Sequence, residues 1–147
     1  MDIFPIYFPQ FCPEPINDKA WGIGFDDWAL VKYANAFNEN WGRRAPAKGF
    51  YDTRKRTVLE TQISQMIESR ITGTAVYHYW FQGQNLLAHT ESYLCNDFDF
   101  PYFLIWANET WSKRWIGRSE IIVPQANVLS DEQIDAHVEY LAKHVSK

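Results

Sequence analysis

A short apolar run that leads into a carboxylate constrains this chain more than any other feature. The run covers Tyr102–Trp106, and Asn108 and Glu109 follow it closely. Its length is that of a strand, and its continuous apolar character predicts a strand buried on both faces, as in a parallel sheet. Binding and catalytic residues of parallel α/β folds lie just beyond the carboxyl ends of their strands. We therefore expect a functional site at Asn108, Glu109 and Arg114.

Further strands are expected on both sides of this run. They cover a range from Pro5 or Ile6 to Phe8, the buried stretch Thr74–Phe81 and a short piece, Ile121–Val123. The segment Gln10–Asp52 reads as one long irregular loop, and a loop of this length inside a compact domain is usually functional.

Three helices are expected among the strands, over Arg54–Arg70, Asn85–Cys95 and Ser130 to about Val145. Asp52 and Thr53 can cap the first, and Ser130 with Gln133 forms a capping box for the last. The alternating order predicts an α/β fold in which crossover helices connect parallel strands.

Composition and charge exclude several classes of function. The 147-residue chain has a formal net charge of -4, and its basic residues are dispersed, so we expect no nucleic-acid partner. No apolar run approaches the roughly 20 residues that span a bilayer, and the N-terminus does not resemble a secretory signal. We expect no integral membrane segment and a cytoplasmic location.

The cysteines and the glycines indicate neither a metal nor a cofactor. Cys12 and Cys95 are far apart and lack CxxC or paired-histidine spacing, so we expect reduced thiols and no metal site. The chain has no GxGxxG or P-loop motif, and we expect no cofactor and no donor site of the Rossmann kind.

Aromatic residues make up 17% of the chain, and many of its seven tryptophans stand beside polar or charged residues. Flat rings beside hydrogen-bonding groups suit a sugar, because its ring faces carry apolar C–H surface while its hydroxyls need polar partners. The same rings can instead fill a core and use their N–H groups on neighbours. The candidate substrate-binding residues are Trp21, Asp27, Trp28, Tyr79, Trp80, Trp106, Asn108, Trp111, Arg114 and Trp115.

Glu109 is the first candidate catalytic residue. Breaking or making a glycosidic bond needs a carboxyl that exchanges a proton with the scissile oxygen, and a second carboxylate. Neighbouring tryptophans would raise the pKa of Glu109 by desolvation, whereas Arg114 would lower it. A structural salt bridge with Arg114 or Lys113 is the alternative role. Candidates for the second carboxylate are Asp18, Asp26, Asp27 and Asp52, the last of which can equally cap a helix.

His78 is the second candidate catalytic residue. It lies near the end of the expected strand Thr74–Phe81, where an imidazole can bind a sugar hydroxyl or shuttle a proton. Alternate side chains of such a strand point to opposite faces, so a satisfied core histidine is the other reading.

Four segments of the chain together carry a family resemblance. They are IYFPQFCPEPINDKAWGIGFDDWALV, FYDTR, AVYHYWFQG and FPYFLIWANETWSKRWIGR. They resemble the WbsX-like glycosyltransferase family, proteins of bacterial polysaccharide and O-antigen loci that are related to glycoside hydrolase family 99-like domains. The resemblance covers about residues 3 to 127.

The resemblance implies the N-terminal part of a (β/α)8 TIM-type barrel that binds sugar at the C-terminal mouth of its strands. A full barrel takes about 250 residues, so we expect residues 1–147 to form one partial, incomplete barrel domain. Its open sheet edges would allow self-association or complementation. The family pattern also covers positions without an assigned role, among them Gln10, Asn17, Phe25 and Arg44. Cys12 stands where the family usually has His, and Asp27 where it usually has Glu.

The function implied is that of a glycosyltransferase of bacterial polysaccharide biosynthesis, including the lipopolysaccharide O-antigen, with a glycan or sugar as partner. Two alternatives stay open from the residues. One is a noncatalytic glycan-binding fragment of a truncated barrel, and the other is a family 99-type glycoside hydrolase. Loss of turnover with retained sugar binding in a Glu109→Gln variant would distinguish an enzyme from a binding fragment.

Overall fold

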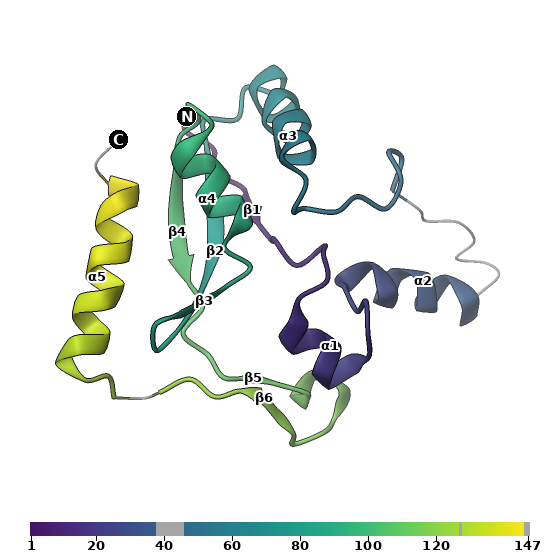
Figure 1. Ribbon diagram of the computed structural model, residues 1–147. Helices are drawn as coiled ribbons and strands as arrows, with labels where there is room; N and C mark the ends of the chain where they lie inside the picture. The colour runs from purple at the N-terminus through teal and green to yellow at the C-terminus, as the bar shows by residue number, and fades with distance from the viewer. Residues whose placement is uncertain (38–45, 127, 146–147) are drawn as a thin grey trace.

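A computed structural model describes residues 1–37, 46–126 and 128–145 of the chain. Its centre is a set of three parallel strands, β1 (Ile6–Tyr7), β2 (Thr74–Phe81) and β4 (Tyr102–Trp106), with β2 in the middle (Figure 1). Ala75 is paired with Ile6 on one side and with Phe103 on the other. The structure is thus mixed α/β, and that these units open an eight-stranded barrel stays a prediction.

Helices cover one face of this sheet. Helix α3 (Arg56–Glu68) connects β1 to β2, and α4 (His89–Asn96) connects β2 to β4. Leu59 of α3 and Leu94 of α4 are fully buried and pack in one cluster with Val76 of β2. Burying each such leucine stabilises the fold by about 1.5–3 kcal/mol relative to leaving it exposed.

The other face of β2 packs against different partners. Tyr79 and Phe81 point to this face, where they join Leu86, Ala107 and Val123 in a second buried cluster. Successive side chains of a strand point to opposite faces, so β2 holds two separate cores together. Seven of its eight residues are buried, as the sequence predicts for this strand.

Strand β4 is less buried than its apolar sequence predicts. Phe103 keeps 49% of its surface exposed and Trp106 keeps 39%. Among the described residues, β4 pairs with β2 alone, so one edge of β4 has no neighbouring strand. The expectation of burial on both faces was therefore wrong for β4 and holds for β2.

The segment expected as one long loop contains two helices, α1 (Pro15–Trp21) and α2 (Asp27–Phe37). Pro15 occupies the first turn of α1, where its missing N–H costs no helical hydrogen bond. The carboxylate of Asp26 accepts the N–H of Ala29 at 3.1 Å and caps α2. The proline-rich composition of this segment concealed both helices.

The helix expected from Asn85 begins later, at His89. Residues Gln84–Leu86 instead form strand β3, which pairs antiparallel with the end of β2. Gln82 and Gly83 both have positive φ, 45° and 93°, the conformation of a two-residue turn that fits a tight hairpin.

Of the two expected helix caps, one is confirmed and the other is wrong. In α5 (Asp131–Val145), the N–H of Ser130 donates to Gln133 Oε1 at 2.9 Å and the N–H of Gln133 donates to Ser130 Oγ at 3.3 Å, a complete capping box. Asp52 does not cap α3. Its carboxylate accepts the N–H and the guanidinium of Arg54 instead, which holds the pKa of Asp52 below its usual range.

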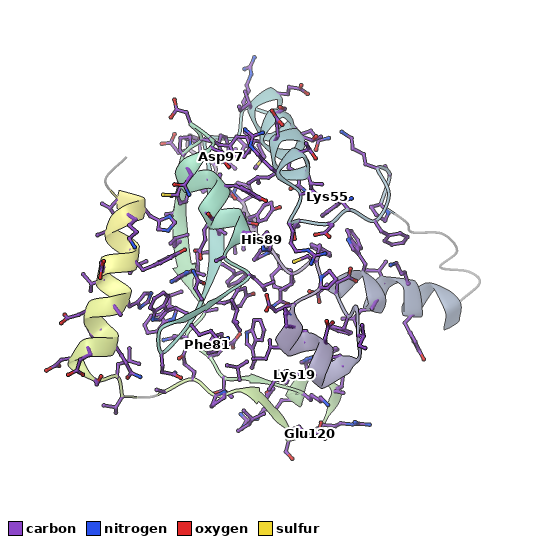
Figure 2. All side chains as sticks on the ribbon, in the orientation of Figure 1. Lys19, Lys55, Phe81, His89, Asp97 and Glu120 are labelled. Atoms are coloured by element: carbon purple, nitrogen blue, oxygen red, sulfur yellow. The ribbon has the colours of Figure 1, made fainter. Side chains whose placement is uncertain are left out.

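The remaining elements form a small unit below α1. Strand β5 (Trp111–Ser112) pairs antiparallel with β6 (Ile121–Val123), and a short 3-10 helix, Arg114–Ile116, lies between them. Lys19 of α1 and Glu120 line one shallow hollow between this hairpin and α1 (Figure 2). No helix of the described residues is long and apolar enough to cross a membrane.

Gly73 gives a test of the packing at the start of β2. A Cβ at this position would collide with the carbonyl oxygen of Pro101 and with the ring of Phe4. We expect Gly73→Ala to lower the free energy of unfolding by about 2–3 kcal/mol in chemical denaturation, because the backbone oxygen cannot move aside cheaply.

Gly49→Ala is the matched control. Gly49 has φ of +80° but open space around it, so its replacement should cost only about 1 kcal/mol of backbone strain. A Gly73→Ala variant no less stable than Gly49→Ala would contradict this account of the packing.

Candidate functional site

A cavity of about 760 Å³ lies beyond the carboxyl ends of β2 and β4. Its volume is that of a site for a small ligand. The lining comes from the segment after β1, from α1 and the start of α2, from β2 and from the chain between β4 and β6. It brings together eight of the site residues predicted from sequence, namely Trp21, Asp27, Tyr79, Asn108, Glu109, Trp111, Arg114 and Trp115.

Stacked rings form one wall of the cavity. Trp21 stacks on Phe25, with ring centroids 5.3 Å apart and planes 21° from parallel, and its centroid lies 5.2 Å from that of Trp115. The ammonium of Lys113 lies 5.1 Å from the centroid of the Trp21 ring. Trp115 is 58% exposed and lines the cavity, so this wall offers open apolar ring surface to a ligand.

Asp27 supplies one carboxyl to the cavity. It is the first residue of α2, which Asp26 caps, and the Asp27 carboxyl accepts no hydrogen bond from other described residues. Burial disfavours its charged form and the charge of Asp26 adds to the effect, so the pKa of Asp27 is raised to about 6. A carboxyl with this pKa can hold or release a proton near neutral pH.

Glu109 supplies the other carboxyl, and Tyr79 connects the two. Burial raises the pKa of the Tyr79 hydroxyl, and the negative charges of Asp27 and Glu109 raise it further. Both carboxylates are therefore within electrostatic reach of one hydroxyl that stays protonated. This arrangement sets two acidic groups and a hydrogen-bond donor around the same space.

The salt bridge weighed as an alternative role for Glu109 does not form among the described residues. Lys113 pairs with Glu120 instead, at 2.7 Å. No ion pair in this part of the chain includes Glu109 or Arg114, and both line the cavity. Their charges are thus available to a ligand.

The cavity also contains residues that sequence reasoning missed. Gln10, Asn17 and Phe25, which match the family pattern but were given no site role, line it, and so does Gln125, which lies outside that pattern. The Gln125 side chain donates to the carbonyl oxygen of Trp80 at 2.9 Å, and its backbone N–H donates to Thr110 Oγ1 at 3.0 Å. The one sequence signal for Gln125 is its position just after Pro124, beyond the end of β6.

Four predicted site residues lie away from the cavity lining: His78, Trp28, Trp80 and Trp106. Trp28 is buried against Phe11 and donates its indole N–H to the carbonyl oxygen of Tyr51 at 2.7 Å. The roles predicted for these residues find no support in the geometry of the cavity. Arg44, another position that matches the family pattern, lies outside the described residues.

Strand alternation explains two of the other three residues. His78 and Trp80 are buried on the face of β2 opposite to Tyr79, because neighbouring side chains of a strand point in opposite directions. Trp106 ends β4 and donates its indole N–H to the carbonyl oxygen of Trp80 at 3.3 Å.

A cysteine and a histidine lie close together outside the cavity lining. Cys12 Sγ is 3.9 Å from His89 Nε2, and that nitrogen is 3.1 Å from Thr53 Oγ1. Burial raises the pKa of Cys12 to about 11 and lowers the pKa of His89 to about 4. Both groups are neutral at pH 7, so the pair is not the thiolate and imidazolium that a nucleophilic cysteine needs.

Comparison with known proteins gives one family. The family model described as "Glycosyltransferase WbsX" matches residues 3–147. Two curated relatives, both named "Uncharacterized protein WxcX" and both from strains of Xanthomonas campestris pv. campestris, are 35% identical over 144 residues. The match covers 95% of this chain and 20% of each relative, so the chain spans about a fifth of their length. No solved structure matches the chain.

The raised pKa of Asp27 predicts how stability depends on pH. A carboxyl whose pKa is higher in the folded than in the unfolded state costs stability once it ionises. The cost is absent below about pH 4 and complete above about pH 6. We expect Asp27→Asn to gain stability relative to the native chain over this window, by about 1–2 kcal/mol after allowance for solvent screening.

Urea denaturation at pH 4.5 and pH 8 measures this difference. Asp99→Asn is the control, because Asp99 is exposed in the segment before β4 and its replacement should change stability equally at the two pH values. A stability difference between Asp27→Asn and the native chain that does not grow from pH 4.5 to pH 8 would refute the raised pKa.

Proposed function

The chain belongs to the WbsX glycosyltransferase family, and from this premise we propose that it binds a sugar in the cavity and takes part in glycosyl transfer during bacterial polysaccharide assembly. The observation that carries the proposal is the meeting of two carboxyls, Asp27 and Glu109, with a wall of stacked aromatic rings in one cavity. Both features suit sugar chemistry, because the rings can bind the C–H faces and the carboxyls can act on the glycosidic oxygen.

The two carboxyls suit different roles. Asp27, with its pKa raised to about 6, supplies a proton to the leaving-group oxygen as the bond between that oxygen and the anomeric carbon breaks. A hydroxyl of the acceptor bonds to the anomeric carbon, and its proton passes to the Glu109 carboxylate. Exchange with solvent returns a proton to Asp27 and removes one from Glu109.

The surrounding groups would orient the sugar. The Tyr79 hydroxyl stays protonated and can donate to a sugar oxygen, while the amide side chains of Gln10, Asn17 and Asn108 can both donate and accept. The guanidinium of Arg114, which pairs with no carboxylate of the described residues, can bind an anionic group of the sugar donor.

We further propose that the three parallel strands are the opening units of a longer (β/α)8 barrel. The support is the alternation β1, α3, β2, α4, β4, into which α1, α2 and β3 are inserted, and the free edge of β4 among the described residues. The cavity would then lie at the C-terminal mouth, the position of active sites in such barrels. The activity of the longer protein is part of this proposal.

Glu109→Gln tests the catalytic part of the proposal. The amide keeps the shape of the side chain but cannot take a proton, so turnover should fall by at least about a hundredfold while sugar affinity stays within about threefold. Turnover is measured as sugar transfer or release with a panel of nucleotide sugars and aryl glycosides, and affinity by calorimetry with the same panel.

Glu68→Gln is the control for this variant, because Glu68 is exposed at the end of α3 and lies outside the cavity lining. Retained turnover in Glu109→Gln would exclude the proposed role of Glu109. Sugar binding by the native chain with no turnover on any donor would favour the glycan-binding fragment instead.

Trp115→Ala tests the aromatic wall. Removal of this ring takes away apolar surface beside Trp21, and we expect sugar affinity to fall about tenfold, equivalent to about 1.4 kcal/mol. Phe103→Ala is the matched control, because Phe103 is also an exposed ring but lies outside the cavity lining. Equal affinity losses in the two variants, or none in Trp115→Ala, would contradict sugar binding at this wall.

A further inference from the structure

A chain of buried titratable side chains lies on the face of β2 opposite to the cavity. His78 is fully buried and Glu91 of α4 is 2% exposed. His78 Nδ1 lies 2.8 Å from Glu91 Oε2, and the Tyr140 hydroxyl donates to Glu91 Oε1 at 3.0 Å. Asn85 also donates to this carboxylate. Three side chains thus surround the Glu91 carboxylate, and because its oxygens can only accept, the contact from His78 is a hydrogen bond when Nδ1 carries the proton.

The other nitrogen of His78 contacts a second histidine. His78 Nε2 lies 3.0 Å from Nε2 of His137 on α5. A hydrogen bond between two imidazole nitrogens requires one of them to carry a proton and the other to accept it. This hydrogen bond can form when both rings are neutral, and also when only one of them is an imidazolium. When both rings are imidazolium, two N–H groups and two positive charges face each other and the bond is lost.

This contact holds α5 on the sheet. His137 is the buried residue of α5, and its ring stacks on that of Trp80, with centroids 4.8 Å apart and planes 5° from parallel. The aliphatic side chains of Ile134 and Val138 are exposed instead, at 45% and 58%. Helix α5, which runs alongside β4 in Figure 1, is therefore attached through rings and hydrogen bonds rather than through an aliphatic core.

The groups that face His137 come from each neighbouring element. His78 comes from β2, Glu91 from α4 and Tyr140 from α5 itself, while β4 contributes the uncharged ring of Trp106. Burial and the neighbouring His78 lower the pKa of His137, and Glu91 opposes them. About two turns further along α5 from His137, the Tyr102 hydroxyl lies 2.7 Å from His144 Nδ1, and the Cys95 thiol donates to the carbonyl oxygen of Lys143.

We propose that Glu91, His78 and His137 form a pH-sensitive latch, which holds α5 on the sheet at neutral pH and releases it when both imidazoles are protonated. Because the pKa of His137 is lowered in the docked state, the released state binds more protons. Docking is therefore complete above about pH 6.5 and weakens as pH falls below it.

Release of α5 would affect the cavity through Trp80, which contacts residues on both sides. The backbone carbonyl of Trp80 accepts hydrogen bonds from Trp106 at 3.3 Å and from the cavity residue Gln125 at 2.9 Å. Its ring is the surface on which His137 stacks. The latch is thus connected to the loop ends that carry the proposed sugar site, although it does not depend on sugar chemistry.

Hydrogen exchange of the whole chain at pH 7.5 and pH 5.0, corrected for intrinsic exchange rates, tests the latch. We expect protection of the α5 amides to fall at least about tenfold at pH 5.0, because the released state binds more protons than the docked state. Protection of β2 and α3 should change much less. Equal protection of α5 at the two pH values would overturn the proposal.

Two variants assign the effect to His137. His137→Phe keeps a ring against Trp80 but removes the titrating nitrogen, so α5 protection should no longer depend on pH. His144→Phe, the control, should keep the pH dependence of the native chain. A pH-dependent loss that persists in His137→Phe would overturn the latch.

If His137→Phe does not fold, NMR titration of the native chain tests the role of His137 in its place. The ring signals of His137 should titrate with the midpoint at which α5 loses protection. Separate midpoints would overturn the proposal.

Discussion

The rest of the structure depends on strand β2 being paired on both edges and buried on both faces. Its parallel partners β1 and β4 fix its register, and seven of its eight side chains are buried. Since successive side chains point to opposite faces, Tyr79 faces the cavity while His78 and Trp80 face the helices. A slip of one residue would exchange the two sets and remove both the cavity lining and the buried histidine contact.

The cavity and the α5 docking surface are therefore two sides of the same strand. On one side, Asp27 and Glu109 act electrostatically on Tyr79, and the rings of Trp21 and Trp115 offer apolar surface. On the other, Glu91 is held by three hydrogen-bond donors that come from β2, β3 and α5. A carboxylate so deeply buried is tolerated because its partners replace the water that it lost.

Sequence patterns predicted the regular elements well where the apolar signal was strong. The apolar pattern predicts the bounds of β2 and β4, and Ser130 with Gln133 predicts the capping box of α5. Prolines concealed α1 and α2, and the turn at Gln82 and Gly83 converted the expected start of a helix into β3. The barrel expected from the family resemblance stays a prediction.

The candidate site could be predicted only in part, because a sequence does not say which face a ring occupies. Trp21, Trp111 and Trp115 line the cavity, whereas Trp28 and Trp80 are buried in the core. In the sequence, all five tryptophans are equally good candidates for sugar binding. Tyr79 and Trp80 are neighbours in sequence, yet they lie on opposite faces. The role of His137 was also beyond sequence reasoning, since its partner His78 is 59 positions away along the chain.

The measurement that tests the central claim most directly is an NMR titration of the tryptophan indole N–H signals with oligosaccharide fragments of bacterial O-polysaccharides. If the cavity is the sugar site, the signals of Trp21, Trp111 and Trp115 should shift together in a saturable way, and those of Trp28 and Trp80 should stay in place. Shifts confined to Trp28 or Trp80, or no saturable shift at the cavity tryptophans with any fragment, would contradict the account.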